Sequence, residues 1–253
     1  MSRWLEGRVL ENRHWTETLF SLRVTLGKGA PRLTFEAGQF VRIALDLGEG
    51  DAGGRVARPF SFVNPPADPV LEFYGVIVPE GPLSPPLARL AAGDTLFVAD
   101  NPSGFLVLSE VPQADDLWLL ATGTGIAPFL SILCTEAPWQ RYRRVVLVHA
   151  VRQARELVYA GLIEEIQASR EQFRTITFVS RENHSKSLSG RMPAAIRDGR
   201  LEAAGGPISP ERSQFMLCGN PQMLKDVAAA LAERGLRKHR RRAPGHITVE
   251  SFW

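Results

Sequence analysis

A short segment in the middle of the chain combines an apolar run, a glycine turn and the start of a helix. Leu117–Ala121 is apolar throughout, Gly123 and Gly125 follow it, and Pro128 stands where a helix would begin. Glycine lets the chain turn where a Cβ would clash, and proline suits a first helical turn because its missing N–H is not needed there. Free N–H groups at such a helix start attract a pyrophosphate. The segment therefore predicts contact with a dinucleotide, although Gly-x-Gly is only part of the G-x-G-x-x-G fingerprint and also fits an ordinary strand-to-helix turn.

Arginines follow expected strand ends in the same half of the chain. Arg152 comes after the apolar run 145–150, Arg181 follows the run 175–180, and Arg191 stands a little further on. Folds that bind NAD usually hold the ribose 2′-hydroxyl with an acid after the second strand, and that acid is absent here. Guanidinium groups bind a 2′-phosphate, which a carboxylate would repel. The pattern favours NADP(H) over NAD(H), although each arginine taken alone is more typical of a solvated surface.

The cysteines and the charged residues narrow the class of protein. Cys134 and Cys218 are far apart and give neither a disulfide framework nor a four-ligand metal site, so no metal is expected. The formal net charge is only +3, but Arg237–Arg242 places five fixed positive charges in six positions. This basic run suits an acidic partner protein or simply a solvated loop. Nucleic acid is not expected, because no aromatic residues are interleaved with the run.

The apolar segments are too short for a membrane protein. None approaches the roughly 20 residues that span a bilayer, and the stretch from Met1 to Gly7 lacks the apolar core of a signal peptide. We therefore expect a cytoplasmic protein with no membrane partner.

From Trp4 to about Asp100 the chain has short, strand-like runs broken by glycine and proline. In Phe20–Leu26 the apolar residues fall at every second position, as in a strand with one buried face. About six antiparallel strands are expected, closed into a β-barrel because closure removes exposed edges. The runs are Phe20–Leu26, Gln39–Leu45, Arg55–Val63, Val70–Val78 and Thr95–Ala99, with a short helical piece near Ser84–Ala91.

After a polar connector, Ser109–Asp116, apolar strands alternate with helical stretches. This alternation predicts a Rossmann-like α/β domain, with a parallel sheet between two layers of helices and a domain boundary between residues 108 and 109. Ligands of such sheets bind beyond the carboxyl ends of the strands, so the segments that follow the strands should converge at one edge. The expected strands are Leu117–Ala121, Val145–Ala150, Thr175–Ser180 and Gln214–Cys218. The expected helices are Pro128–Glu136, Ala154–Arg170, Met192–Arg197 and Pro221–Arg234.

Several motifs spread over both halves make the interpretation more specific. The chain contains R-x-[YF]-S at Arg58–Ser61, G-x-x-S at Gly81–Ser84, G-T-G-I-A-P at Gly123–Pro128, C-G-N-P at Cys218–Pro221 and a final aromatic pair, Phe252-Trp253. Together they resemble the ferredoxin–NADP reductase superfamily over essentially the whole chain. The likeness is greatest to the bacterial ferredoxin/flavodoxin–NADP(H) reductases that end in an aromatic pair.

The resemblance implies that residues 1–108 bind FAD and residues 109–253 bind NADP(H). The implied FAD contacts are Arg58, Pro59, Phe60, Ser61, Val63, Val76, Ile77, Val78, Pro82, Leu83, Ser84, Thr124, Phe252 and Trp253. The implied NADP(H) contacts are Val151, Arg152, Ser180, Arg181, Arg191, Asn220, Pro221, Gln222 and Asp226.

The resemblance also implies roles for individual side chains. Arg58 would pair with the FAD pyrophosphate, and Ser61 would hydrogen-bond near the flavin N5 atom. Phe60 replaces the family's usual tyrosine, which keeps ring stacking but removes the phenol. Cys218 would lie near the nicotinamide and Glu250 would be a proton source, so Ser61, Cys218 and Glu250 are the candidate catalytic residues. The alternatives are a small buried residue at a strand end for Cys218 and a solvated glutamate for Glu250.

The chain end would return to the FAD. Phe252 would cover the flavin face that the nicotinamide must reach, and Trp253 would stack on the adenine; simple docking of the tail on a core is the alternative. The implied reaction is hydride transfer from NADPH to flavin N5, followed by single-electron steps to ferredoxin or flavodoxin.

These acceptors are typically acidic, and the basic run Arg237–Arg242 would steer them to a monomeric enzyme. Two alternatives remain open: a reductase that serves an oxygenase or free flavins, and a non-catalytic FAD-binding electron-transfer subunit.

Overall fold

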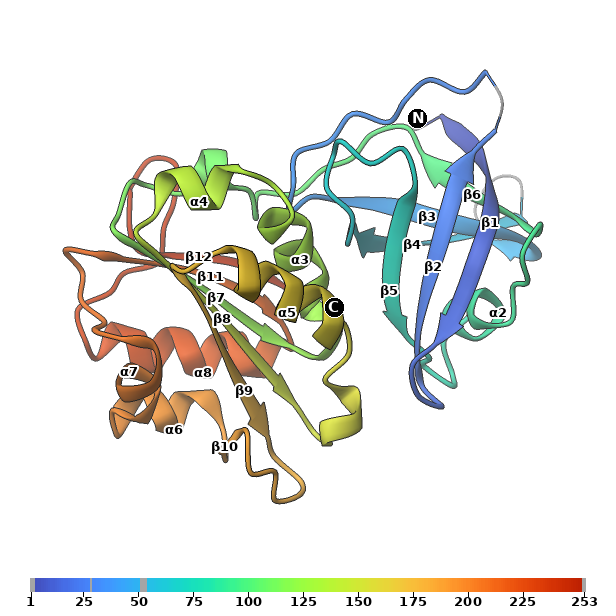
Figure 1. Cartoon of the computed structure of the whole chain (residues 1–253). Coiled ribbons are helices and arrows are strands. Elements are labelled where there is room, and N and C mark those ends of the chain that lie inside the picture. Colours follow the sequence, from blue (N-terminus) through green and yellow to red (C-terminus); the bar gives the residue numbers. More distant parts are fainter. Residues whose placement is uncertain (1–2, 28, 51–53, 252–253) are drawn as a thin grey trace. The chain divides into compact units, whose positions relative to one another are not determined.

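A computed structural model describes residues 3–27, 29–50 and 54–251 and divides the chain into two compact units, Met1–Phe105 and Leu106–Trp253 (Figure 1). The division falls between Phe105 and Leu106, whereas the sequence analysis placed the domain boundary after residue 108. Each unit contains one six-stranded sheet, antiparallel in the first and parallel in the second. The predicted two-domain fold class is confirmed.

The first unit is a closed antiparallel sheet with the strand order β4-β3-β6-β1-β2-β5. An isolated bridge between Phe62 and Phe73, and the hydrogen bond from the Val63 N–H to the Glu72 carbonyl (2.9 Å), join the end of β4 to β5 and so connect the two outer strands. Its elements are β1 Trp4–His14, β2 Leu19–Leu26, β3 Phe40–Gly50, β4 Arg55–Ser61, β5 Leu71–Val76, α2 Ser84–Ala88 and β6 Thr95–Ala99.

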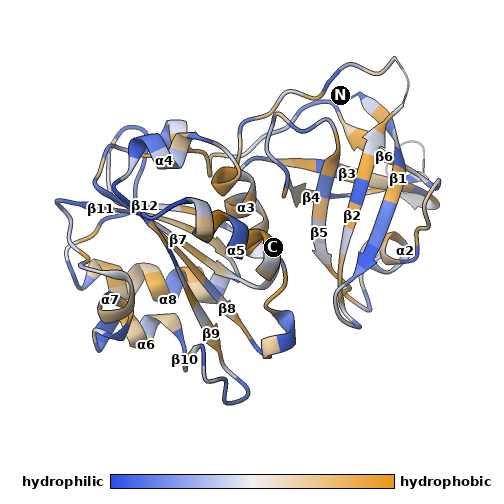
Figure 2. Cartoon of the chain, viewed as in Figure 1, coloured by the Kyte–Doolittle hydropathy of each residue, from blue (hydrophilic) through white to orange (hydrophobic). Residues whose placement is uncertain are grey.

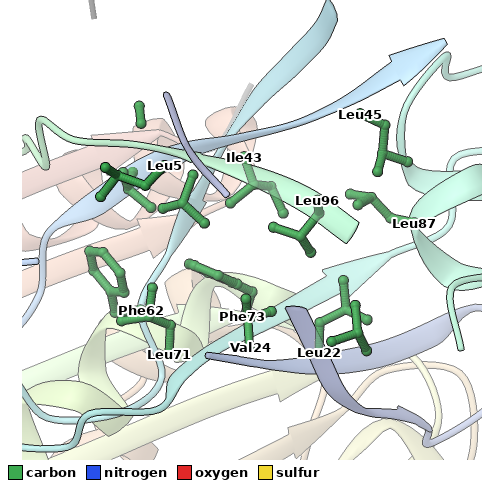
Figure 3. Packing of buried hydrophobic residues seen from close by; sticks show 14 of the residues in the cluster. Leu5, Leu22, Val24, Ile43, Leu45, Phe62, Leu71, Phe73, Leu87 and Leu96 are labelled. Carbon is green, nitrogen blue, oxygen red and sulfur yellow. The ribbon is translucent and has the colours of Figure 1, made fainter. Parts of the chain in front are cut away.

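Alternation along the strands explains the core of this unit. In β1 the side chains of Leu5 and Val9 are buried while Glu6 and Arg8 are exposed, so every second residue faces inward. Figure 3 shows labelled side chains from five of the strands in one buried cluster, which also contains Leu87 from α2. The helix therefore fills one end of the barrel with an apolar residue.

The second unit is a parallel sheet with the strand order β10-β9-β8-β7-β11-β12. Helices α3, α4 and α5 cover one face and α6, α7 and α8 the other (Figure 1), and hydrophobic stretches occupy the central strands between them (Figure 2). Its strands are β7 Asp116–Thr122, β8 Arg144–Val151, β9 Phe173–Val179, β10 Leu188–Ser189, β11 Ser213–Gly219 and β12 Ile247–Ser251. Its helices are η1 Leu108–Glu110, η2 Gly123–Ile126, α3 Ala127–Leu133, α4 Ala137–Arg141, η3 Ala154–Glu156, α5 Ala160–Ser169, α6 Met192–Arg197, α7 Arg200–Gly205 and α8 Pro221–Ala232.

Two predicted helices differ from the structure. The helix expected over Pro128–Glu136 ends at Leu133, and a second short helix, α4, follows it. The helix expected over Ala154–Arg170 is interrupted, because Tyr159 has a left-handed φ of 61° at the start of α5. A residue in that conformation cannot continue a right-handed helix.

Three strands were missing from the predicted ranges: β1 in the first unit, and β10 and β12 at the two edges of the parallel sheet. β10 has two residues and β12 five, and each pairs with one other strand of the sheet, so neither shows the long apolar run of a central strand. Among the described helices, none is both long and apolar enough to cross a membrane.

Candidate functional site

The segments that follow four neighbouring strands lie together at one edge of the parallel sheet, called here the C-terminal edge. The strands end in register, with Thr122 beside Ala150 and Val151 beside Val179. Hydrogen bonds continue beyond the strands, from the Arg181 N–H to the Arg152 carbonyl (2.9 Å) and from the Asn220 N–H to Thr122 Oγ1 (3.0 Å). The structure thus brings together the sequence-separated segments that were predicted to converge.

Glycine is required at the turn that leaves β7. Gly123 has a φ of 52°, in the left-handed region that favours glycine. A Cβ on Gly125 would stand 2.6 Å from the Cys218 carbonyl oxygen, so this residue must be glycine for the turn to pack on the end of β11. The side chain of Thr124, between them, is buried. Close packing therefore fixes the turn Gly123–Ile126 against two strand ends.

Three arginines at the C-terminal edge carry a positive charge that no acidic side chain among the described residues neutralises. Arg152, Arg181 and Arg191 are all exposed, and they follow β8, β9 and β10, which are adjacent in the sheet. Within the described residues, none of these guanidinium groups forms an ion pair or a side-chain hydrogen bond. Positive charge without a carboxylate partner is what a phosphate ligand requires. The C-terminal edge therefore offers positive charge that could bind an anion.

A pocket of about 420 Å³ lies in the loop between β9 and β10. The residues that line this pocket could not be predicted from the sequence, because the loop has no motif and its residues meet only when β10 pairs with β9. It lies between Arg181 and Arg191 along the chain. The lining residues are Val179, Glu182, Asn183, His184, Ser185, Ser187, Leu188 and Ser189.

The remaining predicted NADP(H) residues begin α8 or end a strand. Asn220 Oδ1 accepts hydrogen bonds from the N–H groups of Gln222 (2.9 Å) and Met223 (3.2 Å), so Asn220 caps α8. The Gln222 side chain donates to Asp226 (2.7 Å), one turn further on. Pro221 occupies the first turn of α8. The hydroxyl of Ser180 donates to the Val151 carbonyl (3.2 Å), which ties the ends of β9 and β8 together.

Cys218 and Glu250 are neighbours across β11 and β12, where they pair in register. Burial, together with the Glu250 carboxylate, raises the pKa of the Cys218 thiol well above its usual value. The sulfur therefore stays protonated and is not a thiolate nucleophile. This agrees with a packing or hydrogen-bonding role for Cys218.

In the first unit, Ser61 is the most informative of the predicted residues. Its side chain is 2% exposed, and its hydroxyl has no hydrogen-bond partner among the described residues. A buried hydroxyl without a partner is costly unless a ligand supplies one. Beside it on β4, Phe60 packs edge-to-face on Phe73, and a Cβ on Gly75 would stand only 2.9 Å from the Phe60 ring. The Ser61 hydroxyl is therefore free to exchange a hydrogen bond with a bound ligand.

The other predicted FAD residues are placed around β4 and the loop before α2. Arg58 is exposed, with one guanidinium nitrogen donating to the Ala57 carbonyl (2.7 Å), and Pro59 follows it, also exposed. The Ser84 hydroxyl accepts a hydrogen bond from the Val78 N–H (2.9 Å), which holds the loop that contains Pro82. Three further residues differ in exposure: Val76 and Ile77 are half-buried, and the Leu83 side chain lies in the barrel core, so only its backbone remains for a ligand. Phe252 and Trp253 lie outside the described residues.

The opposite edge of the parallel sheet, called here the N-terminal edge, also carries arginines. A pocket of about 450 Å³ there contains the fully buried carboxylate of Asp116. Asp116 accepts hydrogen bonds from Arg144 Nη2 (2.9 Å) and Arg212 Nε (2.7 Å). In the same pocket, Arg174 donates to two backbone carbonyls. The arginines of this pocket therefore serve the protein's own acceptors, and we do not assign the pocket to a nucleotide.

The basic run Arg237–Arg242 also belongs to the N-terminal edge. Lys238 forms a bridge with Ile247, the first residue of β12, so the run lies beside the start of that strand. Arg241 pairs with Glu110 through Nε (2.9 Å), and this bond holds the pKa of Glu110 below its usual value. The described residues contain no group of three or more His, Cys, Asp or Glu side chains that would hold a metal ion.

Comparison with known proteins agrees with this architecture. Residues 119–229 match the family model described as an oxidoreductase NAD-binding domain. A β-barrel followed by such a domain defines a class of two-domain nucleotide-dependent oxidoreductases.

Full-length relatives identify the family within that class. The chain is 48% identical to the flavodoxin/ferredoxin–NADP reductase of Shigella flexneri and 47% identical to that of Escherichia coli K12, in both cases over 256 residues that cover 100% of each chain. A crystal structure of a ferredoxin NADP⁺ reductase from Neisseria gonorrhoeae, with bound FAD and NADP, superimposes with a TM-score of 0.91 at 32% identity and 100% coverage of both chains. The chain belongs to the flavodoxin/ferredoxin–NADP reductase family.

Proposed function

We propose that this protein transfers electrons between NADP(H) and ferredoxin or flavodoxin, with FAD bound to the first unit and NADP(H) bound at the C-terminal edge of the second. The observation that carries the coenzyme assignment is the row of exposed arginines Arg152, Arg181 and Arg191, whose guanidinium groups form no ion pair among the described residues. These are the charges that a ribose 2′-phosphate would neutralise, and NADH lacks that group. The relatives named above are NADP reductases, which supports the same assignment.

The case for FAD rests on β4. The partnerless hydroxyl of Ser61 would donate to a polar atom of the flavin ring, Phe60 would pack against the ring, and Arg58 would bind the pyrophosphate. The bound flavin would supply the chemistry by taking up a hydride from NADPH and releasing electrons singly. The Neisseria relative was crystallised with FAD and NADP, which agrees with these assignments.

The residues of the protein contribute geometry and electrostatics. The turn Gly123–Ile126 gives a dinucleotide close access to the backbone, because Gly123 carries no Cβ and nothing among the described residues lies within 4 Å of the position a Cβ would take. The protonated thiol of Cys218 is neutral and would not repel the coenzyme. Glu250, beside it, is our candidate for a proton source. Phe252 and Trp253 remain candidates for the flavin face and the adenine.

The acceptor is proposed to be an acidic electron-transfer protein. Arg237, Arg240 and Arg242 are exposed cations that would attract it, whereas Arg241 is already engaged by Glu110. Association would then be fast at low salt and slower as ions screen the charges.

The purified protein provides the test. It should be yellow, and anaerobic NADPH should bleach its flavin absorbance far faster than NADH does. The bleached protein should then pass electrons to ferredoxin or flavodoxin. A colourless protein, or equal bleaching by both coenzymes, would contradict the proposal. Reduction of free flavins, without reduction of either protein acceptor, would indicate the alternative branch of reductases.

A further inference from the structure

His149 is a buried side chain next to the glycine turn, and it has no role in the function proposed above. It lies in β8, where it pairs in register with Ala121 of β7 and Thr177 of β9. Its side chain is 1% exposed. A polar ring in the middle of a parallel sheet requires a hydrogen-bond partner, because burial without one is costly.

The partner is the glycine turn itself. His149 Nε2 lies 3.0 Å from the carbonyl oxygen of Gly123. A carbonyl oxygen can only accept, so Nε2 must carry the hydrogen and donate it. Burial lowers the pKa of His149 to about 4, which keeps the ring neutral at physiological pH. The ring is therefore a permanent single donor to the first carbonyl of the turn.

This bond also orients the next N–H group. The Gly123 carbonyl and the Thr124 N–H belong to one planar trans peptide, in which C=O and N–H point in opposite directions. Because His149 draws the carbonyl toward the sheet, the Thr124 N–H is turned away from the ring. Gly123 has no Cβ to limit rotation of this peptide, and its surroundings are open among the described residues. The His149 bond adds a second restraint on this peptide, which also belongs to the short helix η2.

The rest of the turn is held by other contacts. Gly125 packs on the end of β11, and the Asn220 N–H bonds to Thr122 Oγ1 (3.0 Å). Among the described residues, His149 is the side chain that hydrogen-bonds to the Gly123 carbonyl. Loss of the ring would remove one restraint on this peptide plane while the strands on either side stay paired.

We propose that His149 is a positioning residue of the NADP(H) site, which fixes the peptide between Gly123 and Thr124 in the orientation that binds the dinucleotide bridge. This inference rests on the proposed function, because it needs NADP(H) at the C-terminal edge. It assigns to β8 a role separate from the arginines: Arg152 and Arg181 would hold the 2′-phosphate, and His149 would act through the turn on the pyrophosphate.

Binding of two ligands by calorimetry tests the proposal without relying on turnover. NADP⁺ contains the pyrophosphate, whereas adenosine 2′-phosphate carries only the 2′-phosphate end. His149→Leu should weaken NADP⁺ binding about tenfold, the effect of one lost buried hydrogen bond, and should leave adenosine 2′-phosphate binding unchanged. His149→Gln, whose amide nitrogen reaches the place of Nε2, should recover most of the NADP⁺ affinity. His149→Asn, which is too short to reach it, should not.

A matched control lies at the opposite edge of the same sheet. Gln214 is buried and donates through Nε2 to the Gly245 carbonyl (3.2 Å). Gln214→Leu removes a comparable bond and should leave both affinities unchanged. If His149→Leu does not fold, His149→Asn against His149→Gln still decides the matter.

Unchanged NADP⁺ binding in the Leu and Asn variants, equal weakening of both ligands, or no recovery with Gln would overturn the inference. If the native holoprotein binds neither ligand, the proposed function itself fails.

Discussion

The two edges of the parallel sheet both carry arginines, but the arginines are used differently. At the N-terminal edge, Arg144 and Arg212 share the buried carboxylate of Asp116. At the C-terminal edge, the guanidinium groups of Arg152 and Arg181 form no ion pair among the described residues. The number of basic residues in a region therefore does not predict a ligand-binding site. What matters is whether acidic groups of the protein already pair with those residues.

The difference has a physical cause in the cost of burying charge. Asp116 is completely buried, and an ionised carboxylate there is tolerable only because two guanidinium groups bond to it. The arginines of the other edge remain in water, where an unpaired charge costs little. The arginines of the N-terminal edge are neutralised by the protein itself, whereas those of the C-terminal edge are the ones that we propose a ligand neutralises.

Asp116→Ala should have the largest effect on the molecule. Removal of the carboxylate leaves two arginines facing each other without a counter-charge, at a cost of about 3 kcal/mol in the free energy of unfolding. Urea denaturation measures this loss. Asp115→Ala is the control, since its side chain is 46% exposed and pairs loosely with Arg143 at 3.7 Å; it should cost less than about 0.5 kcal/mol. Equal losses in the two variants would show that Asp116 is not the centre of this edge.

Arg152→Gln and Arg181→Gln should change coenzyme use without changing stability. Each variant removes charge-assisted hydrogen bonds to the 2′-phosphate, so kcat/KM for NADPH should fall about ten- to a hundredfold while that for NADH stays the same. Steady-state kinetics with both coenzymes measure the change. Arg174→Gln, at the opposite edge, is the control. A similar fall with NADH would mean that these arginines do not recognise the 2′-phosphate.

Ser61→Ala tests whether the partnerless hydroxyl belongs to a ligand. Since the hydroxyl bonds to nothing among the described residues, the apoprotein should be no less stable without it. Flavin reduction by NADPH should slow about fivefold, the effect of one neutral hydrogen bond of about 1 kcal/mol. Ser21→Ala is the matched control, because Ser21 is also buried but accepts a bond from Trp15 Nε1 (3.1 Å). The control should lose stability and keep its flavin reduction rate; the reverse pattern would refute the assignment.

The basic run should give the smallest effects. Arg240→Gln and Arg242→Gln should lower the rate with the protein acceptor about twofold at low salt, and added salt should abolish the difference.

Arg241→Gln should affect acid stability instead. The pKa of Glu110 is lowered in the folded protein by Arg241, so the stabilisation is present above the usual glutamate pKa and is lost as pH falls through the lowered value. Acid denaturation below pH 4.5 should therefore be less steep in the Arg241 variant. An acceptor rate that only Arg241→Gln lowers would contradict this division of roles.

Much of the fold and of the C-terminal edge could be predicted because the sequence patterns that indicate them are local. The glycine turn after β7 and the arginines after β8 and β9 are read from short stretches in which an apolar strand ends and polar residues begin. Parallel pairing then brings those ends together by necessity, whatever the helices between them do.

The remaining features depend on contacts between distant residues. The basic run could be recognised as charged, but its place at the N-terminal edge follows from the pairing of Lys238 with Ile247, which no local pattern indicates. His149 looks like one more residue of an apolar strand until Gly123 is placed beside it. The partnerless hydroxyl of Ser61 is likewise visible only after the barrel has formed around it.

We propose above that the arginines of the C-terminal edge, which form no ion pair among the described residues, select NADP(H) over NAD(H). Anaerobic stopped-flow reduction of the flavin, with NADPH and with NADH on the native protein and on the Arg152→Gln, Arg181→Gln double variant, tests it most directly. The account predicts that the native protein prefers NADPH about a hundredfold or more, and that the double variant loses that preference by slowing with NADPH alone. A native protein that reacts equally with both coenzymes, or a double variant that keeps the preference, would contradict it.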